Sequence, residues 1–361
     1  MKHNTTISEI MQEVICEKEI EEITKKQGYE EKARTAKVSV ILGYQLCGAV
    51  EKSESYRELE IDGEKNGLRK VDYSTLSRKS KEIPYEITLE LLELTMGRCN
   101  RSSRRQVTKE YNRFIRIFDT TRFVDLNSKW KWACHQDSCS EVKAHISYCA
   151  QTGLPDKFNI GQITVGDTEY LEDFCKNSTE SDCILADRGY FNISKFCHLD
   201  DAGQDFVIRI RNTTNLVNPV SYDFTADDKY NDILCTLGKD RRIPKEHRNR
   251  QFRVVSFMGS NGEKVTLCTN IYSLTADEIA ELYRMRWAIE TFFKTLKQNF
   301  SLKKIFGTSL NAVFTQVIIN FIAYIVLFTA FSSVRFAFSF LTFLRKIRAN
   351  LIVFSSLMDK L

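Results

Sequence analysis

The 361-residue sequence lacks any segment with the composition of a long disordered tail, and it lacks a repeat of fixed period. These absences exclude a mainly disordered chain and a solenoid built from repeats. It also lacks a large charge excess, since 52 Lys and Arg face 47 Asp and Glu. The total charge therefore indicates no partner, and the location of the basic residues matters more. Hydrophobic residues make up 43%, an ordinary globular balance, and the length predicts two or three domains.

The cysteines lack a regular spacing, and the N-terminal residues lack the apolar core of a secretory signal. An odd number of cysteines, 11 in all, without an export signal is typical of reduced thiols, so we expect a cytoplasmic protein. Cys134, His135 and Cys139 resemble half of a zinc site. No second pair of ligands stands at a suitable distance, which favours a structural role for them.

One apolar run has the composition of a membrane span. Residues 317–334 contain no charged residue, but this run is only just long enough to cross a bilayer. It contains Asn320 and Thr329 and has neither an aromatic belt nor a clear basic flank. We therefore predict a buried helix of an α/β domain and no membrane contact, with a membrane-associated protein as the alternative.

The N-terminal region, residues 1–110, is rich in charge and predicts helices. Within it, Asp72 or Ser74 is expected to cap a helix that opens with hydroxyl and basic side chains. Several arginines follow between residues 98 and 109. Both features suit contacts to nucleic-acid phosphates, although a solvated surface or linker fits the same pattern.

Short apolar runs after residue 110 predict the strands of an α/β core. They lie at 114–118, 142–150, 158–165, 183–186 and 206–210. A short helix is predicted around 170–175. The order of three strands, a helix, a strand, a helix and a strand matches a ribonuclease-H-like core better than a repeated βαβ fold. Residues 212–272 interrupt this core as a β-rich insertion, with strands at 252–258 and 264–269 joined by a Gly-Ser-Asn-Gly turn.

The strongest basic run of the sequence lies in this insertion, just before the predicted hairpin. Its cations are Lys239, Arg241, Arg242, Lys245, Arg248, Arg250 and Arg253. Such a run is expected to contact DNA phosphates, and a solvated loop is the alternative.

A predicted helix after the insertion carries a notable set of polar residues. Thr275 followed by Glu278 forms a capping box, which predicts that the helix begins there. At about 100° per residue, four polar side chains share an arc of about 60° on one continuous helix, with Lys294 beside them. They are Tyr283, Arg286, Glu290 and Lys297. Periodicity alone fits a charged solvent face equally well.

Two aspartates change this interpretation. Asp119 and Asp187 each follow a predicted strand directly, and the carboxyl ends of strands are where α/β sheets place catalytic groups. Together with Glu290 they provide three carboxylates, which can hold two divalent ions roughly 3.5–4 Å apart. Arg286 and Lys297 would bind phosphate oxygens, the first as a fork and the second as a point charge.

The residues that carry this chemistry also resemble a known family. The spacing resembles the YREK signature of bacterial insertion-sequence transposases of the insertion sequence four family, within the DDE superfamily. In this sequence it is Tyr283-x₂-Arg286-x₃-Glu290-x₆-Lys297. Asp119 in IFDTT and Asp187 in LADRGY are similar to the family's first and second aspartate motifs. The resemblance covers about residues 110–330.

The resemblance implies a ribonuclease-H-like catalytic core at 111–330, an N-terminal DNA-binding region at 1–110 and a helical tail at 331–361. It implies two Mg²⁺ ions, for which Mn²⁺ can substitute, held by Asp119, Asp187 and Glu290. It further implies phosphate contacts from Tyr283, Arg286 and Lys297. We also expect DNA contacts from other cations, namely Lys294, Arg188, Arg248, Arg250 and Arg253.

The implied reaction is cleavage at terminal inverted repeats, which frees a 3′-hydroxyl that attacks the opposite strand to form a hairpin and later attacks target DNA. The expected partner is double-stranded DNA, with a dimer assembled on paired ends. Trp287 is expected to pack rather than to stack on a flipped base. Two alternatives stay open: a catalytically silent DNA-binding relative, and a nuclease of the same fold without strand transfer.

Overall fold

The computed structural model describes residues 15–107, 114–125, 129–135, 139–162, 166–175, 182–222, 229–238, 247–334 and 336–349. The chain forms two compact units, and each draws on segments that are distant in the sequence. The first unit comprises Met1–Val107, Arg122–Lys143 and Phe292–Leu361, and the second comprises Thr108–Thr121 and Ala144–Thr291.

The described part of the first unit is largely helical. Its helices are α2 (Glu17–Lys26), α3 (Val38–Glu51), α4 (Tyr56–Lys65), α5 (Tyr73–Glu82), α6 (Tyr85–Val107), α11 (Leu310–Ser333) and α12 (Phe340–Arg348). Asp72 caps α5 by accepting a hydrogen bond of 2.8 Å from the backbone N–H of Ser74. Helices α3 and α4 pack closely because Gly63 faces Tyr44: a Cβ at this glycine would lie 2.1 Å from the ring.

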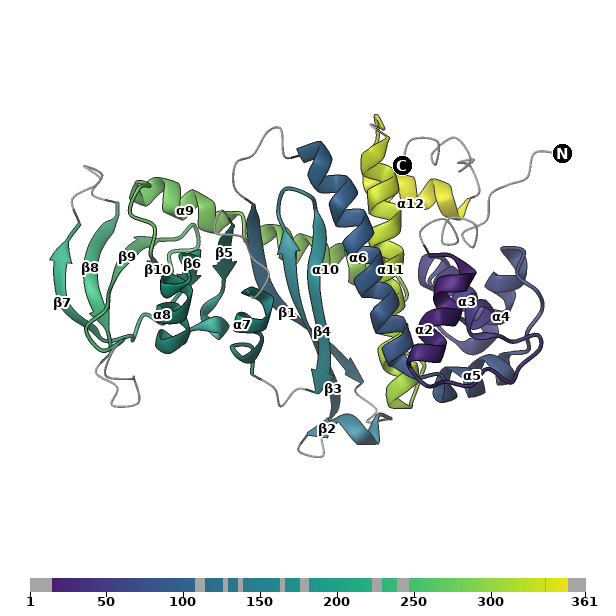
Figure 1. Ribbon diagram of the computed structural model, residues 1–361. Helices are drawn as coiled ribbons and strands as arrows, with labels where there is room; N and C mark the ends of the chain where they lie inside the picture. The colour runs from purple at the N-terminus through teal and green to yellow at the C-terminus, as the bar shows by residue number, and fades with distance from the viewer. Residues whose placement is uncertain are drawn as a thin grey trace. The chain divides into compact units, whose positions relative to one another are not determined.

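Helix α11 is the buried centre of this unit. It packs against α6 and α3, and Figure 1 shows α11 beside α6. The most apolar window of α11 is 94% buried. Two of its buried polar side chains, Asn320 and Thr329, donate to carbonyls one turn earlier, at 2.6 and 2.7 Å. The prediction that this run forms a buried helix is confirmed.

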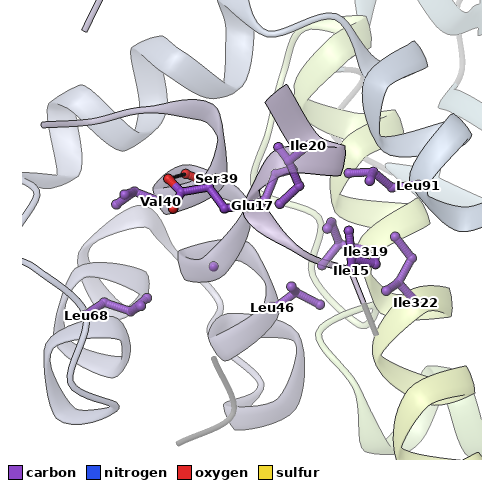
Figure 2. Close-up of a pocket in the computed structure, with 12 residues that line it drawn as sticks. Ile15, Glu17, Ile20, Ser39, Val40, Leu46, Leu68, Leu91, Ile319 and Ile322 are labelled. Carbon is purple, nitrogen blue, oxygen red and sulfur yellow. Dashed lines mark hydrogen bonds between the residues drawn. The ribbon is translucent and has the colours of Figure 1, made fainter. Parts of the chain in front are cut away.

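An apolar pocket of about 210 Å³ opens among α2, α3, α6 and α11 (Figure 2). Its walls are mainly aliphatic and include Leu46, Leu91 and Ile319. The polar side chains of Ser39 and Glu17 also line it and are joined by a hydrogen bond of 3.2 Å. A cavity with this lining suits an apolar side chain and has no cations for phosphate binding.

The second unit is organised around a sheet. Its first strands are β1 (Ile115–Asp125), β3 (Cys139–Cys149), β4 (Leu154–Gln162), β5 (Cys183–Ala186) and β6 (Asp205–Arg209). They lie in the order β4-β3-β1-β5-β6, and β5 is parallel to both β1 and β6. Helix α7 (Glu169–Cys175) precedes β5 and α8 (Ile193–Asp201) follows it. The predicted order of strands and helices is therefore confirmed. In the chain, the short 3₁₀ helix η1 (Lys131–Ala133) and β2 (Cys134–His135) follow β1 and precede β3.

The insertion extends the same sheet through four antiparallel strands (Figure 1). They are β7 (Leu216–Ser221), β8 (Asn231–Leu237), β9 (Gln251–Met258) and β10 (Lys264–Thr269). Strand β10 pairs with β6 and with β9, which confirms the predicted hairpin. Strand β7 could not be recognised from sequence because it is largely exposed and bulged, with Asn218 at φ 50°. The fold is mixed α/β, with one large sheet and helices.

An aromatic core fixes the strands that carry the candidate site. Phe118 of β1, Phe196 of α8 and Phe206 of β6 are fully buried in one apolar cluster. The rings of Phe196 and Phe206 lie 5.1 Å apart, and Phe118 contacts Phe174 of α7 edge-on at 5.5 Å. Because Phe118 directly precedes Asp119, this packing holds the first aspartate's strand in place.

Candidate active site

Asp119 and Asp187 lie next to each other on neighbouring parallel strands. The register pairs Phe118 with Ala186, the last residue of β5, so each aspartate is the next residue on its strand. Asp187 follows its strand directly, as predicted. The prediction that Asp119 also follows a strand is wrong, because β1 continues to Asp125. Asp119 instead lies where β1 extends past the end of β5, so the two carboxylates still share one edge.

Backbone amides hold both carboxylates. Asp119 Oδ1 accepts a hydrogen bond of 2.8 Å from the N–H of Thr120, and Asp187 Oδ1 accepts one of 2.8 Å from the N–H of Gly189. The second bond caps the short 3₁₀ helix η2 (Arg188–Tyr190). Each carboxylate is thus oriented by a donor that follows it in the chain.

Glu290 lies on the second of two helices, α9 (Ala276–Arg284) and α10 (Trp287–Asn299). The capping box begins α9 as predicted, with bonds of 3.2 and 2.7 Å between Thr275 and Glu278. The prediction of one continuous helix is wrong. The N–H groups of Met285 and Arg286 bond to carbonyls three residues earlier, at 3.1 and 3.0 Å, which tightens the chain into a turn. The predicted arc of polar side chains is therefore divided between two helices.

Arg286, at this turn, connects two of the three carboxylates. Its Nη2 lies 2.5 Å from Glu290 Oε1 and its Nη1 lies 3.6 Å from Asp119 Oδ2. The guanidinium carbon lies 5.8 Å from the ring centroid of Tyr283 and 5.9 Å from that of Trp287. The structure thus brings Asp119, Glu290 and Arg286 together.

Charge accumulates around Asp119. Burial, assisted by the negative charges of Asp187 and Glu290, raises the pKa of its carboxyl to about 6, although the Thr120 N–H and Arg286 oppose the shift. The site therefore holds more negative charge than its single guanidinium balances. A bound cation would relieve this repulsion.

The donor chemistry fits divalent magnesium, which prefers carboxylate oxygens. In the described part of the chain, however, no three His, Cys, Asp or Glu side chains stand close enough to hold one ion. Arg286 supplies the positive charge between Asp119 and Glu290 instead. The three carboxylates would hold a metal ion only after Glu290 leaves this ion pair.

The other residues predicted to contact DNA differ in their exposure. Arg188, Lys294 and Arg248 are exposed. Lys297 is half-buried, donates to the Arg122 carbonyl at 2.9 Å, and has its pKa lowered by burial. Tyr283 is partly buried, which raises its pKa to about 12.

Two arginines near β9 that were predicted to contact DNA pair with carboxylates, and for the buried Arg253 the prediction is wrong. The guanidinium of Arg253 is fully buried and pairs with Asp232 through Nε at 3.0 Å and Nη2 at 2.7 Å. Arg250 bonds to Asp200 at 3.0 Å and to Asp201 at 2.5 Å. Both arginines therefore stabilise the fold internally. The remaining cations of the predicted basic run, at 239, 241, 242 and 245, lie outside the described residues.

The expected packing of Trp287 is also wrong, because 62% of this side chain is exposed. Its position directly after the α9–α10 turn explains the difference, since a continuous helix would have placed it at another angle. An exposed indole beside Arg286 is available to stack on a planar ligand.

A polar cluster beside the aspartates was not predicted from sequence. The hydroxyl of Thr120 lies 3.1 Å from His145 Nδ1, 3.1 Å from Asp167 Oδ1 and 3.3 Å from the Tyr190 hydroxyl. Thr120 and His145 gave no distinct signal, because the strands that carry them contain several other polar residues. Asp167 stands alone between segments and carries no periodic pattern.

Comparison with known proteins agrees with this geometry. Residues 104–326 match the family model described as transposase DDE domain. The chain is 31% identical over 355 residues to a probable transposase for insertion sequence element IS5377 of Geobacillus stearothermophilus, covering 96% of this chain and 91% of the relative. It is 26% identical to a putative transposase for IS4SA of Synechocystis, over 80% of each chain.

A solved structure has a similar fold. The cryo-EM structure of a piggyBac transposase synaptic complex with hairpin DNA aligns with a TM-score of 0.52 at 12% identity, over 99% of this chain and 82% of that one. At this identity the likeness concerns the fold alone. The match to the family model over more than half of the chain and the bacterial relative together show that this chain belongs to the DDE transposase family of DNA-cleaving and DNA-transferring enzymes.

Proposed function

We propose that the chain cuts and joins DNA at the terminal inverted repeats of an insertion sequence, as a member of the insertion sequence four family. The observation that carries this proposal is the placement of Asp119 beside Asp187, with Glu290 joined to Asp119 through Arg286. The strand order β4-β3-β1-β5-β6 supports a ribonuclease-H-like core.

In this proposal Asp119, Asp187 and Glu290 hold two Mg²⁺ ions, or Mn²⁺ in their place. When bound, the metal ions would activate water and stabilise the attacking and leaving oxygens of the phosphodiester. Arg286 would move from Glu290 to a DNA phosphate, for which its fork geometry is suited. Trp287, with 62% of its side chain exposed, would stack on an unpaired base near the cleaved end.

The remaining parts of the proposal concern DNA and assembly. Arg188, Lys294 and Arg248 are exposed and would contact phosphates. Tyr283 and Lys297 would contact the end that is transferred, and the N-terminal helices would bind the repeats. A hairpin intermediate and a dimer on paired ends complete the cut-and-paste scheme. A cytoplasmic location is consistent with the free thiols of the described cysteines.

The test is cleavage of a donor plasmid that carries the element's own ends, with Mg²⁺, by the wild-type protein and by Asp187→Asn. Wild type is expected to release the flanked segment and the variant is not, since it loses one carboxylate ligand. Omitting one end should prevent release by a transposase, whereas a plain nuclease would cut either plasmid.

Two results would contradict the proposal. Release by both proteins would mean that Asp187 is not part of the site. No release by either, with binding to the repeats intact, would favour the catalytically silent DNA-binding alternative.

A second prediction concerns the exposed cations. Replacing Arg188 and Lys294 together by Gln is expected to weaken binding to end DNA and to reduce the slope of log K against log[salt] by about 2, because each lost phosphate contact contributes about 0.9. The measurement is fluorescence anisotropy across a salt series. The matched control is the pair Arg211→Gln and Lys264→Gln, also exposed. If both double variants gave the same slope, the predicted phosphate contacts of Arg188 and Lys294 would be contradicted.

A further inference from the structure

Asp167 forms part of a polar cluster beside the two aspartates. Its Oδ1 accepts a hydrogen bond of 3.1 Å from the Thr120 hydroxyl and lies 3.6 Å from Nδ1 of the fully buried His145. The Thr120 hydroxyl also lies 3.3 Å from the Tyr190 hydroxyl. The imidazole of His145 packs on the Tyr170 ring, with centroids 4.3 Å apart. Several partners therefore fix the Thr120 side chain.

The other oxygen of Asp167 faces the segment that follows the second aspartate. A Cβ added to Gly189 would lie 3.1 Å from Asp167 Oδ2 and 3.0 Å from Asp187 Oδ1. Both carboxylates thus lie close against the backbone of Gly189. No larger residue fits there without moving one of them, which keeps the Gly189 N–H within reach of Asp187.

Asp167 consequently contacts the residues whose amides hold both predicted metal ligands. Thr120 donates its N–H to Asp119, and Gly189 donates its N–H to Asp187. Asp167 accepts from the side chain of the first and packs on the backbone of the second. The Asp167 carboxylate therefore contacts both residues whose N–H groups orient Asp119 and Asp187.

The charge of Asp167 acts on a buried hydroxyl that also faces the two aspartates. Burial raises the pKa of the Tyr190 hydroxyl well above its ordinary value, and the charges of Asp119, Asp167 and Asp187 all raise it further. All three carboxylates therefore lie near the Tyr190 hydroxyl. Asp167 adds a negative charge beside the two predicted metal ligands, which a bound cation would offset.

We propose that Asp167 is a positioning residue for metal binding: through Thr120 and Gly189 it fixes the orientation of the Asp119 and Asp187 carboxylates. This inference rests on the proposed function, because it assumes that these two aspartates hold the metal ions. Side chains that orient metal ligands typically contribute 10–100-fold to metal affinity or activity.

The experiment measures Mn²⁺ affinity by calorimetry on the full-length protein without DNA. Asp167→Ala is expected to weaken Mn²⁺ binding about 10–100-fold. Asp167→Asn, which keeps an acceptor for Thr120, should weaken it less. Thr120→Val should also weaken binding, and Thr120→Ser, which keeps the hydroxyl, should restore it. The matched control is Glu169→Ala, which removes an exposed carboxylate two residues away and should bind Mn²⁺ like wild type.

The outcomes separate this inference from the proposed function. Asp119→Asn is the reference: an unchanged Mn²⁺ affinity in this variant would overturn the metal site itself. If Asp119→Asn weakens binding but Asp167→Ala behaves like Glu169→Ala, the positioning role of Asp167 is overturned and the metal site stands. Should Asp167→Ala fail to fold, the Thr120 pair decides: equal affinities for Thr120→Val and Thr120→Ser would also overturn the proposal.

Discussion

Glu290→Gln is expected to reduce strand cleavage at the element's ends on the order of 1,000-fold, while binding to the same DNA stays within about twofold of wild type. Glutamine keeps the shape of the side chain and an oxygen for Arg286, but it removes the charge that a metal ion requires. The measurement is single-turnover cleavage of labelled end DNA with saturating Mg²⁺, together with a binding titration in Ca²⁺ or EDTA.

The matched control is Glu281→Gln on α9, whose carboxylate is 65% exposed and pairs only weakly, at 3.5 Å, with Arg284. This variant should cleave like wild type. If Glu290→Gln lost binding as steeply as cleavage, the residue would act through the structure of the α9–α10 turn. If it cleaved at the wild-type rate, the third carboxylate would have to be sought elsewhere.

The strands of the core were predictable where a short apolar run is bounded by polar residues. The runs at β5 and β10 match the observed strands residue by residue, and the run at β9 begins one residue after the observed strand. Strand β1 was underestimated because Asp119 and the polar residues after it have the composition of a turn. They form a strand because pairing within the sheet outweighs this local preference.

The break between α9 and α10 left no mark in the sequence. Residues 284–287 contain neither Gly nor Pro, so periodicity predicts a continuous helix. At the turn, Arg286 pairs with Glu290 four residues later and with Asp119 from a distant part of the sequence. The three carboxylates could be proposed from the sequence, whereas their relation through Arg286 required the fold.

In the basic run, the sequence predicted a DNA contact for a residue that the structure buries. Charge density predicted a surface for DNA, but β9 is buried on both faces from Phe252 to Ser256, which encloses Arg253 within the fold. Asp167 was missed for a related reason, because a lone acidic residue has no pattern. Its partners His145 and Tyr190 come from elements far away in the sequence.

Arg253→Ala is expected to lower the free energy of unfolding by about 3–5 kcal/mol, because it leaves the buried carboxylate of Asp232 without its partner. The guanidinium is fully buried, forms two bonds to Asp232, and donates to the carbonyls of Ile271 and Leu274 at 3.0 and 2.6 Å. These bonds tie β8 and β9 to the segment that leads into α9. Urea denaturation monitored by circular dichroism measures the effect.

The control is Arg248→Ala, an exposed arginine from the same basic run, which should change stability by less than about 0.5 kcal/mol. The double variant Arg253→Met with Asp232→Leu should be more stable than Arg253→Ala, since it removes the unpaired charge as well as the pair. Removing a buried ion pair would not change the salt dependence of DNA binding by the folded protein. If Arg253→Ala were as stable as wild type and reduced the salt dependence of DNA binding, Arg253 would instead be a DNA-binding residue.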